Sequence, residues 1–333
     1  MVDPDATADL PLLPQAWEFR SAPLPERIAA LVSEAAQRRG SGYRGRFAPS
    51  PTGPLHRGNL RTALVSWLEA RRRGGEWILR LDDLDTPRNR PGAEAAILAD
   101  LRWLGLHWDG PLVRQSQRRG LYATVLSCLR RSGHLYPCRC SRRLLADISA
   151  PHGAPPRYPG TCRSGPPVWG LVDGRLPSWR LRLPPAPLLW LERCGPAPTP
   201  TLQAVPGGAT AGDPVLRRAD GVIAYHLATA VDELMLGISE VVRGEDLRSS
   251  TPAQVAVMRA LGQHPPSYRH LPLWLDADGR RLSKRLGSEG LEAARERGAD
   301  AAQVIGAMAA SLGLVPQGSR LSAVELAQES GSR

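Results

Sequence analysis

The segment from residue 43 to 108 alternates strand and helix patterns, and this alternation constrains the fold more than any other feature of the chain. Two short stretches of strand character, YRGRF and EWILRL, are each followed by a longer segment with apolar residues at helical spacing. The apolar positions expected to face the core are Leu60, Leu64, Trp67 and Leu68 in the first helix, and Ile97, Leu101 and Leu104 in the second. Strands joined by helices of this length pair in parallel through right-handed crossovers. We therefore predict an α/β fold built on a parallel sheet.

The rest of the chain divides into segments of different character. An amphipathic helix is expected near the N-terminus, with Ile28, Leu31 and Ala35 on its apolar face. Residues 109–215 begin with another helix and continue with Pro- and Gly-rich sequence holding short strands such as SWRLRL and PLLWLE, which is typical of an insertion. Strand and helix patterns then resume, including a helix opened by a Ser/Thr cap and Pro252. We expect, in chain order, an N-terminal extension, a first α/β half, an insertion, a second α/β half and a helical C-terminal segment, with bounds 1–42, 43–108, 109–215, 216–290 and 291–333.

The charge balance points to a polyanionic partner. The chain has 43 basic and 32 acidic residues, a net charge of +11 at pH 7, and nucleic acid is the simplest partner for such an excess. Abundant Ala, Gly and Pro suggest that genomic base composition favours arginine over lysine, but this would not explain the excess. No run of about 18 or more apolar residues occurs, which excludes a membrane-spanning helix. The acidic N-terminus lacks the features of a signal peptide, so we expect a cytoplasmic protein with no membrane partner.

His56 marks a candidate phosphate site. A proline-rich loop delivers it to the start of a predicted helix, and Asn59 follows three residues later, about one turn away on the same face. Helix N-termini present unpaired N–H groups and a positive dipole end, which favour phosphate. A histidine beside a glycine is also common as a purely structural residue.

Lys284 is the only lysine among the 43 basic residues. It lies in the sequence RRLSKR, after the turn sequence DADGR and between Gly279 and Gly287, which can act as hinges. Lysine is a compact charge on a flexible stem and can follow a moving phosphate, which arginine does less well. The alternative is that a single lysine stands here by chance.

The cysteines indicate a metal site rather than disulfides. Their number is five, and the chain carries no export signal, which argues against a disulfide framework. Cys138 and Cys140, followed by Cys162, provide thiolates at a density that suits tetrahedral zinc. The fourth ligand is open between Tyr158 and His152, and reduced, metal-free thiols are the alternative. Cys128 and Cys194 have no partner at metal spacing and are expected to be buried as small apolar residues.

Taken together, these motifs resemble those of class I aminoacyl-tRNA synthetases. PLHRGN and RLSKR are similar to the HIGH and KMSKS motifs of that class and occur in the same order. Sequences from Gly45 to Leu291 narrow the resemblance to the glutamyl group: GRFAPSPTGPLHRGN, LRLDDLDTPR, LGLHWDGP, QSQR, LYPCRCSR, DGVIAYHLATAVDE and VVRGEDL. The resemblance implies a Rossmann-type catalytic domain that carries a zinc-bearing insertion.

The resemblance assigns the nucleotide chemistry to four residues. His56, Asn59 and Lys284 would bind the ATP phosphates, with Mg²⁺ expected alongside ATP. They would stabilise the transition state in which the carboxylate of glutamate attacks the α-phosphate. Ser283, beside the lysine, completes the catalytic set, and the family chemistry explains why this one position carries lysine.

The resemblance also assigns a pocket for L-glutamate. Arg46 and Arg243 would bind its carboxylates, since arginine binds a carboxylate in bidentate fashion. Ser50 would line the pocket and Tyr225 would donate to a carboxylate. Asp82 would face the ammonium group, although the family usually has glutamate at this position. A side chain one methylene shorter must reach the ammonium through water or a shifted backbone.

Two features resemble the truncated glutamyl-Q tRNA(Asp) synthetases within this group. That family carries the same Cys-x-Cys, Tyr, Cys arrangement, which favours Tyr158 as the fourth zinc ligand, with one structural Zn²⁺ per chain. The residues after Lys284 are too few for an anticodon-binding domain of ordinary size. The resemblance implies ATP-dependent activation of glutamate and its transfer onto queuosine in the anticodon loop of tRNA(Asp). We expect the protein to act as a monomer.

Three alternatives stay open. A glutamyl- or glutaminyl-tRNA synthetase without an anticodon domain would charge a tRNA 3′ end instead. A non-catalytic tRNA-binding paralogue would keep the fold but lose the phosphate motifs, which are intact here. A nucleotidyltransferase or an amino-acid ligase acting on a small molecule would have no use for affinity toward RNA, so the salt dependence of tRNA binding would separate it.

Overall fold

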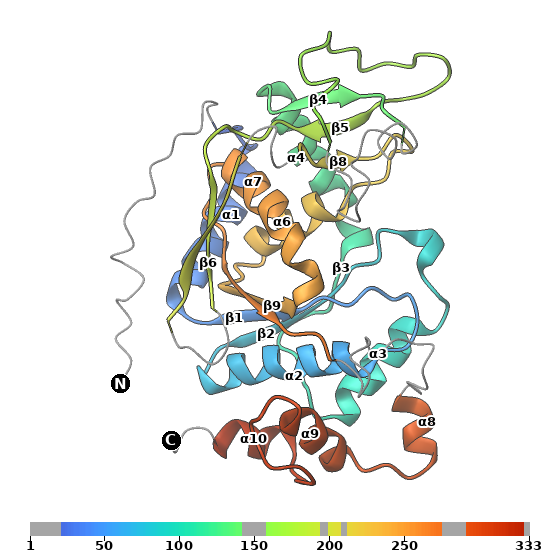
Figure 1. Cartoon of the computed structure of the whole chain (residues 1–333), viewed down its shortest axis with the longest axis vertical. Coiled ribbons are helices and arrows are strands. Elements are labelled where there is room, and N and C mark those ends of the chain that lie inside the picture. The colour runs from blue at the N-terminus through green and yellow to red at the C-terminus, as the bar shows by residue number, and fades with distance from the viewer. Residues whose placement is uncertain (1–20, 142–157, 194–198, 208–211, 275–290, 330–333) are drawn as a thin grey trace.

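The strands predicted between residues 43 and 108 form a parallel sheet that is connected by helices. The structure is a computed structural model in which the described residues are 21–141, 158–193, 199–207, 212–274 and 291–329 (Figure 1). Strands β1 (Arg44–Phe47), β2 (Glu76–Leu81) and β3 (Val113–Arg114) pair in parallel in that order. Helix α2 (Arg57–Arg72) connects β1 to β2, and α3 (Ala93–Trp103) precedes β3. The parallel α/β expectation for this part of the chain is therefore confirmed.

A second group of strands continues beside β1. Its order is β9 (Glu240–Gly244), β10 (Ser267–Leu271), β6 (Leu188–Glu192) and β7 (Thr201–Val205), parallel except for the β6–β7 hairpin. β1 and β9 lie next to each other, and the Ser239 N–H donates to the carbonyl of Arg44 at 2.9 Å. In open sheets of this kind, a crevice forms at the carboxyl ends of the strands where the chain order switches. Here that point lies between β1 and β9.

Helices cover both faces of the strands. α2 packs against β1, β2 and β9, whereas α6 (Tyr225–Met235) and α7 (Thr251–Ala260) lie on the other side (Figure 1). The apolar residues predicted to face the core from α2 and α3 are all buried. In β2, both the Trp77 side and the Arg80 side are buried, because a central parallel strand is covered on two faces. α7 begins at Thr251 with Pro252 in its first turn, as predicted, but Ser250 makes no side-chain cap.

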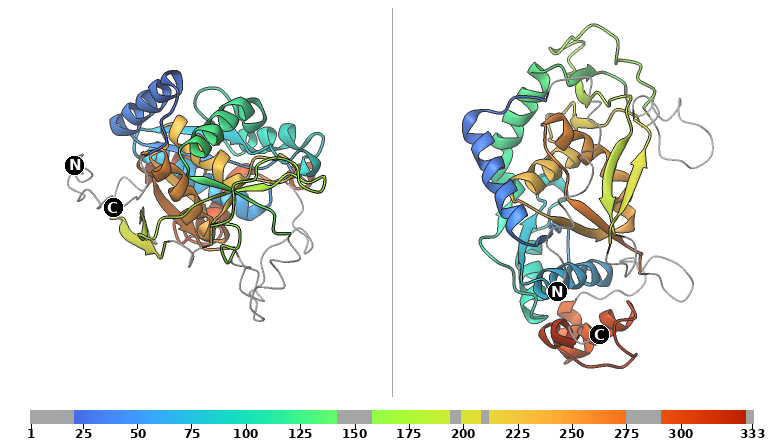
Figure 2. Two further views of the ribbon diagram at one scale, coloured as in Figure 1. Left: turned by 90° about the horizontal axis from the view of Figure 1, so that it is seen from above. Right: turned by 90° about the vertical axis from the view of Figure 1, so that its left-hand side faces the viewer.

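The N-terminal helix packs onto the core. α1 (Glu26–Ser41) contacts α6, and its buried residues are Val32 and Ala35. Leu31, expected on the apolar face, is instead 44% exposed, so the buried stripe is rotated from the predicted one. In the right-hand view of Figure 2, α1 and α4 (Arg119–Arg131) cover the side opposite the β6–β7 hairpin.

Two smaller units flank the sheet. An antiparallel sheet holds β4 (Leu135–Cys138), β5 (Ser178–Leu181) and β8 (Val215–Arg217). At the other end lie α8 (Leu291–Glu296), α9 (Ala301–Ala310) and α10 (Ala323–Glu329). α9 and α10 pack on α2, where Arg72 Nη2 donates to the carbonyl of Leu326 at 2.9 Å. Within the described part of the chain, no helix has the length and apolar character needed to cross a membrane.

The contact between α9 and the segment before α10 gives a stability prediction. A Cβ added at Gly306 would overlap the carbonyl oxygen of Ser319, which is backbone and cannot rotate away. We expect Gly306→Ala to lower the free energy of unfolding by about 1–3 kcal/mol. Gly120→Ala, also within a helix but with open space around the new Cβ, is the matched control and should be neutral or slightly stabilising. Thermal unfolding measures both, and equal melting temperatures for the two variants would contradict the packing argument.

Candidate active site

A cavity of about 610 Å³ opens at the carboxyl ends of β1, β2, β9 and β10, at the switch point between β1 and β9. It brings together seven predicted site residues from separate segments of the chain. These are Arg46, Ser50, His56, Asn59, Asp82, Tyr225 and Arg243. Ser283 and Lys284 lie outside the described residues.

His56 caps the helix that forms one wall of this cavity. It is the N-cap of α2, and its Nδ1 accepts a hydrogen bond from the backbone N–H of Asn59 at 3.2 Å. An imidazole that accepts at Nδ1 must carry its proton on Nε2. A Cβ at Gly58 would lie 3.1 Å from the ring, so glycine leaves room for the imidazole over the first turn. This arrangement leaves Nε2 as the nitrogen that can donate to a ligand.

Arg46 is buried at the end of β1 and is already paired. Its Nε donates to Glu233 at 2.9 Å and its Nη1 to the carbonyl of Val242 at 3.0 Å. Glu233 lies in α6 and is itself fully buried. Burial would raise the pKa of Glu233, but Arg46 and Arg80 lower it overall, so the group is ionised. One of the two arginines expected to attract glutamate is thus already paired with a carboxylate of the protein.

Asp82 shares its carboxylate with Arg80. The arginine donates from Nε to one oxygen at 2.7 Å and from Nη2 to the other at 3.2 Å. Burial raises the pKa of Asp82 to about 6, and the charge of Arg80 limits the rise. Asp82 therefore lines the cavity as a carboxylate that titrates just below neutral pH.

A second carboxylate in α6 completes this buried network. Asp232 lies 3.6 Å from Arg80 and is held by Gln115 at 2.9 Å and Arg118 at 2.7 Å. The hydroxyl of Tyr122 also donates to it at 2.9 Å. Sequence analysis did not assign Asp232, Glu233 or Arg80 to the site. Two consecutive acids inside the apolar stretch AVDELML were an available signal, because buried acids require cationic partners.

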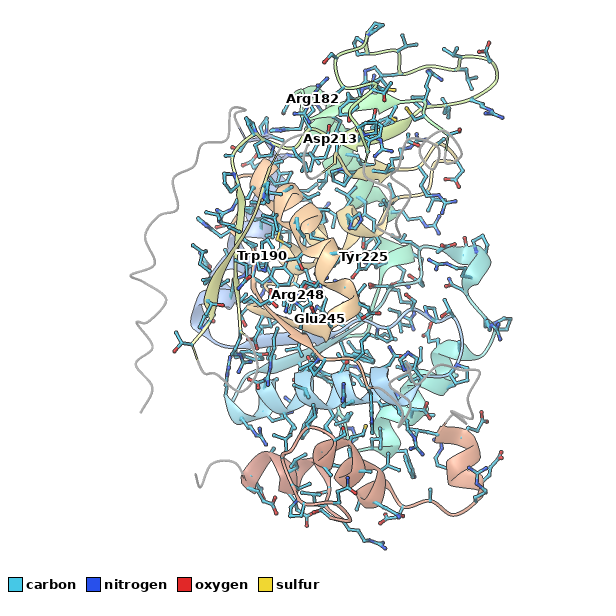
Figure 3. All side chains as sticks on the ribbon, in the orientation of Figure 1. Arg182, Trp190, Asp213, Tyr225, Glu245 and Arg248 are labelled. Carbon is cyan, nitrogen blue, oxygen red and sulfur yellow. The ribbon has the colours of Figure 1, made fainter. Side chains whose placement is uncertain are left out.

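Arg243, at the end of β9, is supported only by neutral groups. Its Nη1 donates to Gln254 at 2.8 Å, its Nη2 to Thr251 at 2.7 Å and its Nε to His270 at 3.1 Å. Among the described residues, no carboxylate forms an ion pair with it. The guanidinium is therefore not neutralised by a direct ion pair, although Glu233 acts on it at longer range. Tyr225, the first residue of α6, lies near the middle of the molecule on the same cavity (Figure 3).

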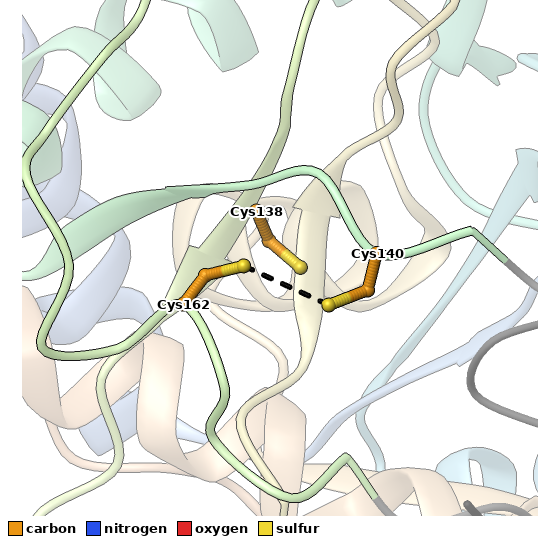
Figure 4. Close-up of side chains that lie close together, drawn as sticks. All are labelled: Cys138, Cys140 and Cys162. Atoms are coloured by element: carbon orange, nitrogen blue, oxygen red, sulfur yellow. Dashed lines mark hydrogen bonds between the residues drawn. The ribbon is translucent and has the colours of Figure 1, made fainter.

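Three cysteines gather in the antiparallel unit. The Sγ atoms of Cys138, Cys140 and Cys162 lie within 4.8 Å of one another, and their side chains point toward a common centre (Figure 4). The Cys140 and Cys162 sulfurs are 3.6 Å apart, close to the about 3.8 Å expected between two thiolates on one tetrahedral zinc. Burial and the neighbouring Cys138 raise the pKa of Cys140 to about 12, and a bound metal ion would displace this proton. The predicted thiolate set fits a zinc ion.

The predicted fourth ligand lies in the same cluster. The hydroxyl oxygen of Tyr158 accepts from the Cys162 N–H at 2.8 Å and contacts the Cys138 sulfur at 3.5 Å. His152 and Cys194 lie outside the described residues. Cys128 is buried in α4, as expected for a cysteine without a metal role.

Comparison with known proteins supports the resemblance to class I aminoacyl-tRNA synthetases. The family model described as the catalytic domain of class I tRNA synthetases (E and Q) matches residues 43–164 and 207–320. A glutamate tRNA ligase from Elizabethkingia meningosepticum superposes with a TM-score of 0.69 at 28% identity, covering 86% of this chain. The present chain spans 64% of that solved chain. The fold is thus that of a class I synthetase catalytic domain.

Closer relatives narrow the class to one family. A glutamyl-Q tRNA(Asp) synthetase from Parasynechococcus marenigrum is 56% identical over 92% of this chain and 96% of its own length. One of the same name from Symbiobacterium thermophilum is 47% identical over 82% of this chain and 87% of its own length. The chain belongs to the glutamyl-Q tRNA(Asp) synthetase family, and it is a ligase.

The cysteine cluster predicts a measurable metal content. We expect the protein purified without chelator to carry about one zinc ion per chain, measured by elemental analysis. Cys162→Ser should lose most of it and melt at a lower temperature, because metal binding contributes to folding. Cys128→Ala, which removes a thiol from the core of α4 instead, should retain the zinc. Full zinc content in Cys162→Ser would contradict the assignment.

Proposed function

We propose that this ligase activates L-glutamate with ATP and transfers it onto queuosine in the anticodon loop of tRNA(Asp). The observation that carries the proposal is the convergence of seven predicted residues on one cavity at the switch point of the sheet. The relatives' shared name supports the choice of acceptor, and the net charge of +11 favours a tRNA partner.

In the first step, a carboxylate oxygen of glutamate attacks the α-phosphate of ATP, and pyrophosphate leaves. His56 would donate from Nε2 to a phosphate oxygen, and Asn59 would bind the same phosphate group from the first turn of α2. Lys284, with Ser283 beside it, would stabilise the charge that develops on the phosphates. Mg²⁺ bound to ATP would offset part of the triphosphate charge.

Recognition of glutamate rests on opposite charges at the two sides of the cavity. Arg243 and Arg46 would bind carboxylate groups, with Tyr225 as an added donor and Ser50 lining the wall. Asp82 would attract the ammonium group. Because Arg80 already holds both oxygens of Asp82, this attraction would act at longer range than a direct ion pair.

In the second step, a hydroxyl of queuosine attacks the carbonyl of the adenylate, an ester forms and AMP leaves. We further propose that residues 43–108 and 216–290 form the two halves of the catalytic domain. The insertion, 109–215, would hold a structural zinc between Cys138, Cys140, Tyr158 and Cys162. Residues 1–42 and 291–333 would be the N-terminal extension and the helical C-terminal segment.

The transfer experiment tests the proposal. Purified protein, ATP and radiolabelled glutamate are incubated with queuosine-containing tRNA(Asp) or with tRNA(Glu). We expect label on tRNA(Asp) that survives enzymatic removal of the CCA end, and none on tRNA(Asp) that carries guanosine in place of queuosine. Label on tRNA(Glu) alone, lost with its 3′ end, would support the second candidate, 3′-end charging, which the likeness to a solved glutamate tRNA ligase favours.

The titration of Asp82 predicts a pH dependence of glutamate binding. With a pKa of about 6, Asp82 is ionised at pH 7 and above and becomes neutral as the pH falls through 6. The KM for glutamate should therefore rise up to about tenfold between pH 7 and pH 5, while the KM for ATP changes less. Pyrophosphate exchange measures both constants. Asp82→Asn should weaken binding and remove this rise, and a rise that persists in the variant would assign it to another group.

A further inference from the structure

A buried chain of hydrogen bonds runs from Glu192 through His270 to Arg243, which lines the cavity. Glu192 in β6 and His270 in β10 are both buried, and His270 Nδ1 lies 2.9 Å from Glu192 Oε1. On its other side, His270 Nε2 lies 3.1 Å from Arg243 Nε. Three adjacent strands, β6, β10 and β9, thus each contribute one side chain to a single line.

The direction of each hydrogen bond in this line is determined by chemistry. An arginine Nε–H can only donate, so His270 Nε2 must accept and the proton must reside on Nδ1. Nδ1–H then donates to Glu192. This is the neutral form of histidine, and it is compatible with burial beside a cation.

Glu192 is itself fixed by two further donors. Arg248 Nη2 lies 2.6 Å from Glu192 Oε1, and the indole N–H of Trp190 donates to Oε2 at 3.1 Å. Trp190 and Arg248 both lie in the middle part of the molecule (Figure 3). The carboxylate is therefore held on both oxygens and fixes the ring plane of His270.

The remaining contacts of Arg243 show what this arrangement achieves. Gln254 and Thr251 each accept one N–H, and His270 accepts the third. Arginine has five N–H groups, which leaves one on each Nη nitrogen for a ligand in the cavity that Arg243 lines. All three supporting acceptors are neutral, so none of them competes with a substrate carboxylate for the charge.

We propose that His270, oriented by Glu192, is a positioning residue that fixes Arg243 for binding a carboxylate of glutamate. The inference rests on the proposed function for the identity of the ligand. It assigns to His270 and Glu192 an effect on glutamate affinity without contact with glutamate. Without the Nε2 acceptor, the guanidinium loses one of its three fixed hydrogen bonds and can rotate, which would displace the two N–H groups that remain for a ligand.

Two substitutions at His270 separate positioning from packing. His270→Phe keeps a flat ring next to Tyr268 but removes the acceptor, whereas His270→Gln can place an amide oxygen near the position of Nε2. We expect the dissociation constant for L-glutamate to rise about 10- to 100-fold in His270→Phe. In His270→Gln it should stay within about threefold of the unmodified protein, since the acceptor is restored. His264→Gln, which makes the same change at an exposed histidine outside the cavity, should leave the affinity unchanged.

Calorimetric titration of the protein with L-glutamate measures these effects. A separate titration with a non-hydrolysable ATP analogue measures nucleotide affinity, and thermal unfolding shows whether each variant is folded. A loss of glutamate affinity with unchanged nucleotide affinity supports the inference. Equal losses for both ligands, equal weakening in His270→Phe and His270→Gln, or wild-type affinity in a folded His270→Phe would each overturn it. Glutamate binding requires neither activation nor tRNA, so a failed transfer experiment would reject the proposed function and leave this test decisive. A protein that does not bind glutamate at all would reject both.

Discussion

The burial of Arg80 is the interaction on which the rest of the site depends. Its side chain is fully buried in β2 and is surrounded by Asp82, Asp232 and Glu233. Moving such charges out of water costs several kcal/mol per ion unless each is paired. The pairing therefore forces α6 to lie over the carboxyl end of β2, and Arg46 joins the same network from β1 through Glu233. The floor of the cavity is assembled by charge neutralisation as much as by apolar packing.

Against this neutralised floor, Arg243 is an exception. It is buried to a similar extent as Arg46, yet its three hydrogen-bond partners are neutral, and the carboxylate of Glu233 acts on it only at longer range. A site for a dicarboxylate needs a cation whose charge is available to the ligand. In the proposed site the two arginines would therefore contribute differently: Arg46 is also tied to α6 through Glu233, whereas Arg243 would supply the larger share of the attraction for a substrate carboxylate.

The sequence predicted the framework well because the framework depends on local periodicity. The helical spacing of Leu60, Leu64 and Leu68 predicts a helix with one buried face. The structure confirms that all three side chains are buried. Arg46 and Arg243, by contrast, looked equivalent, since a strand arginine carries no mark of its future partner. Their difference depends on Glu233 and His270, which come from distant segments. Pairings of this kind are set by tertiary packing and leave no periodic trace in the sequence.

His56 shows how one local motif can serve structure and chemistry together. Accepting the Asn59 N–H at Nδ1 satisfies one of the unpaired donors at the start of α2. The same bond fixes the tautomer, so that Nε2 must be the donor. A phosphate held by this N–H would gain a hydrogen bond without requiring a protonated imidazole, and the helix dipole adds its positive end at the same place. The structural and the proposed catalytic roles of this histidine are therefore compatible, because the cap fixes the tautomer that would donate to a phosphate.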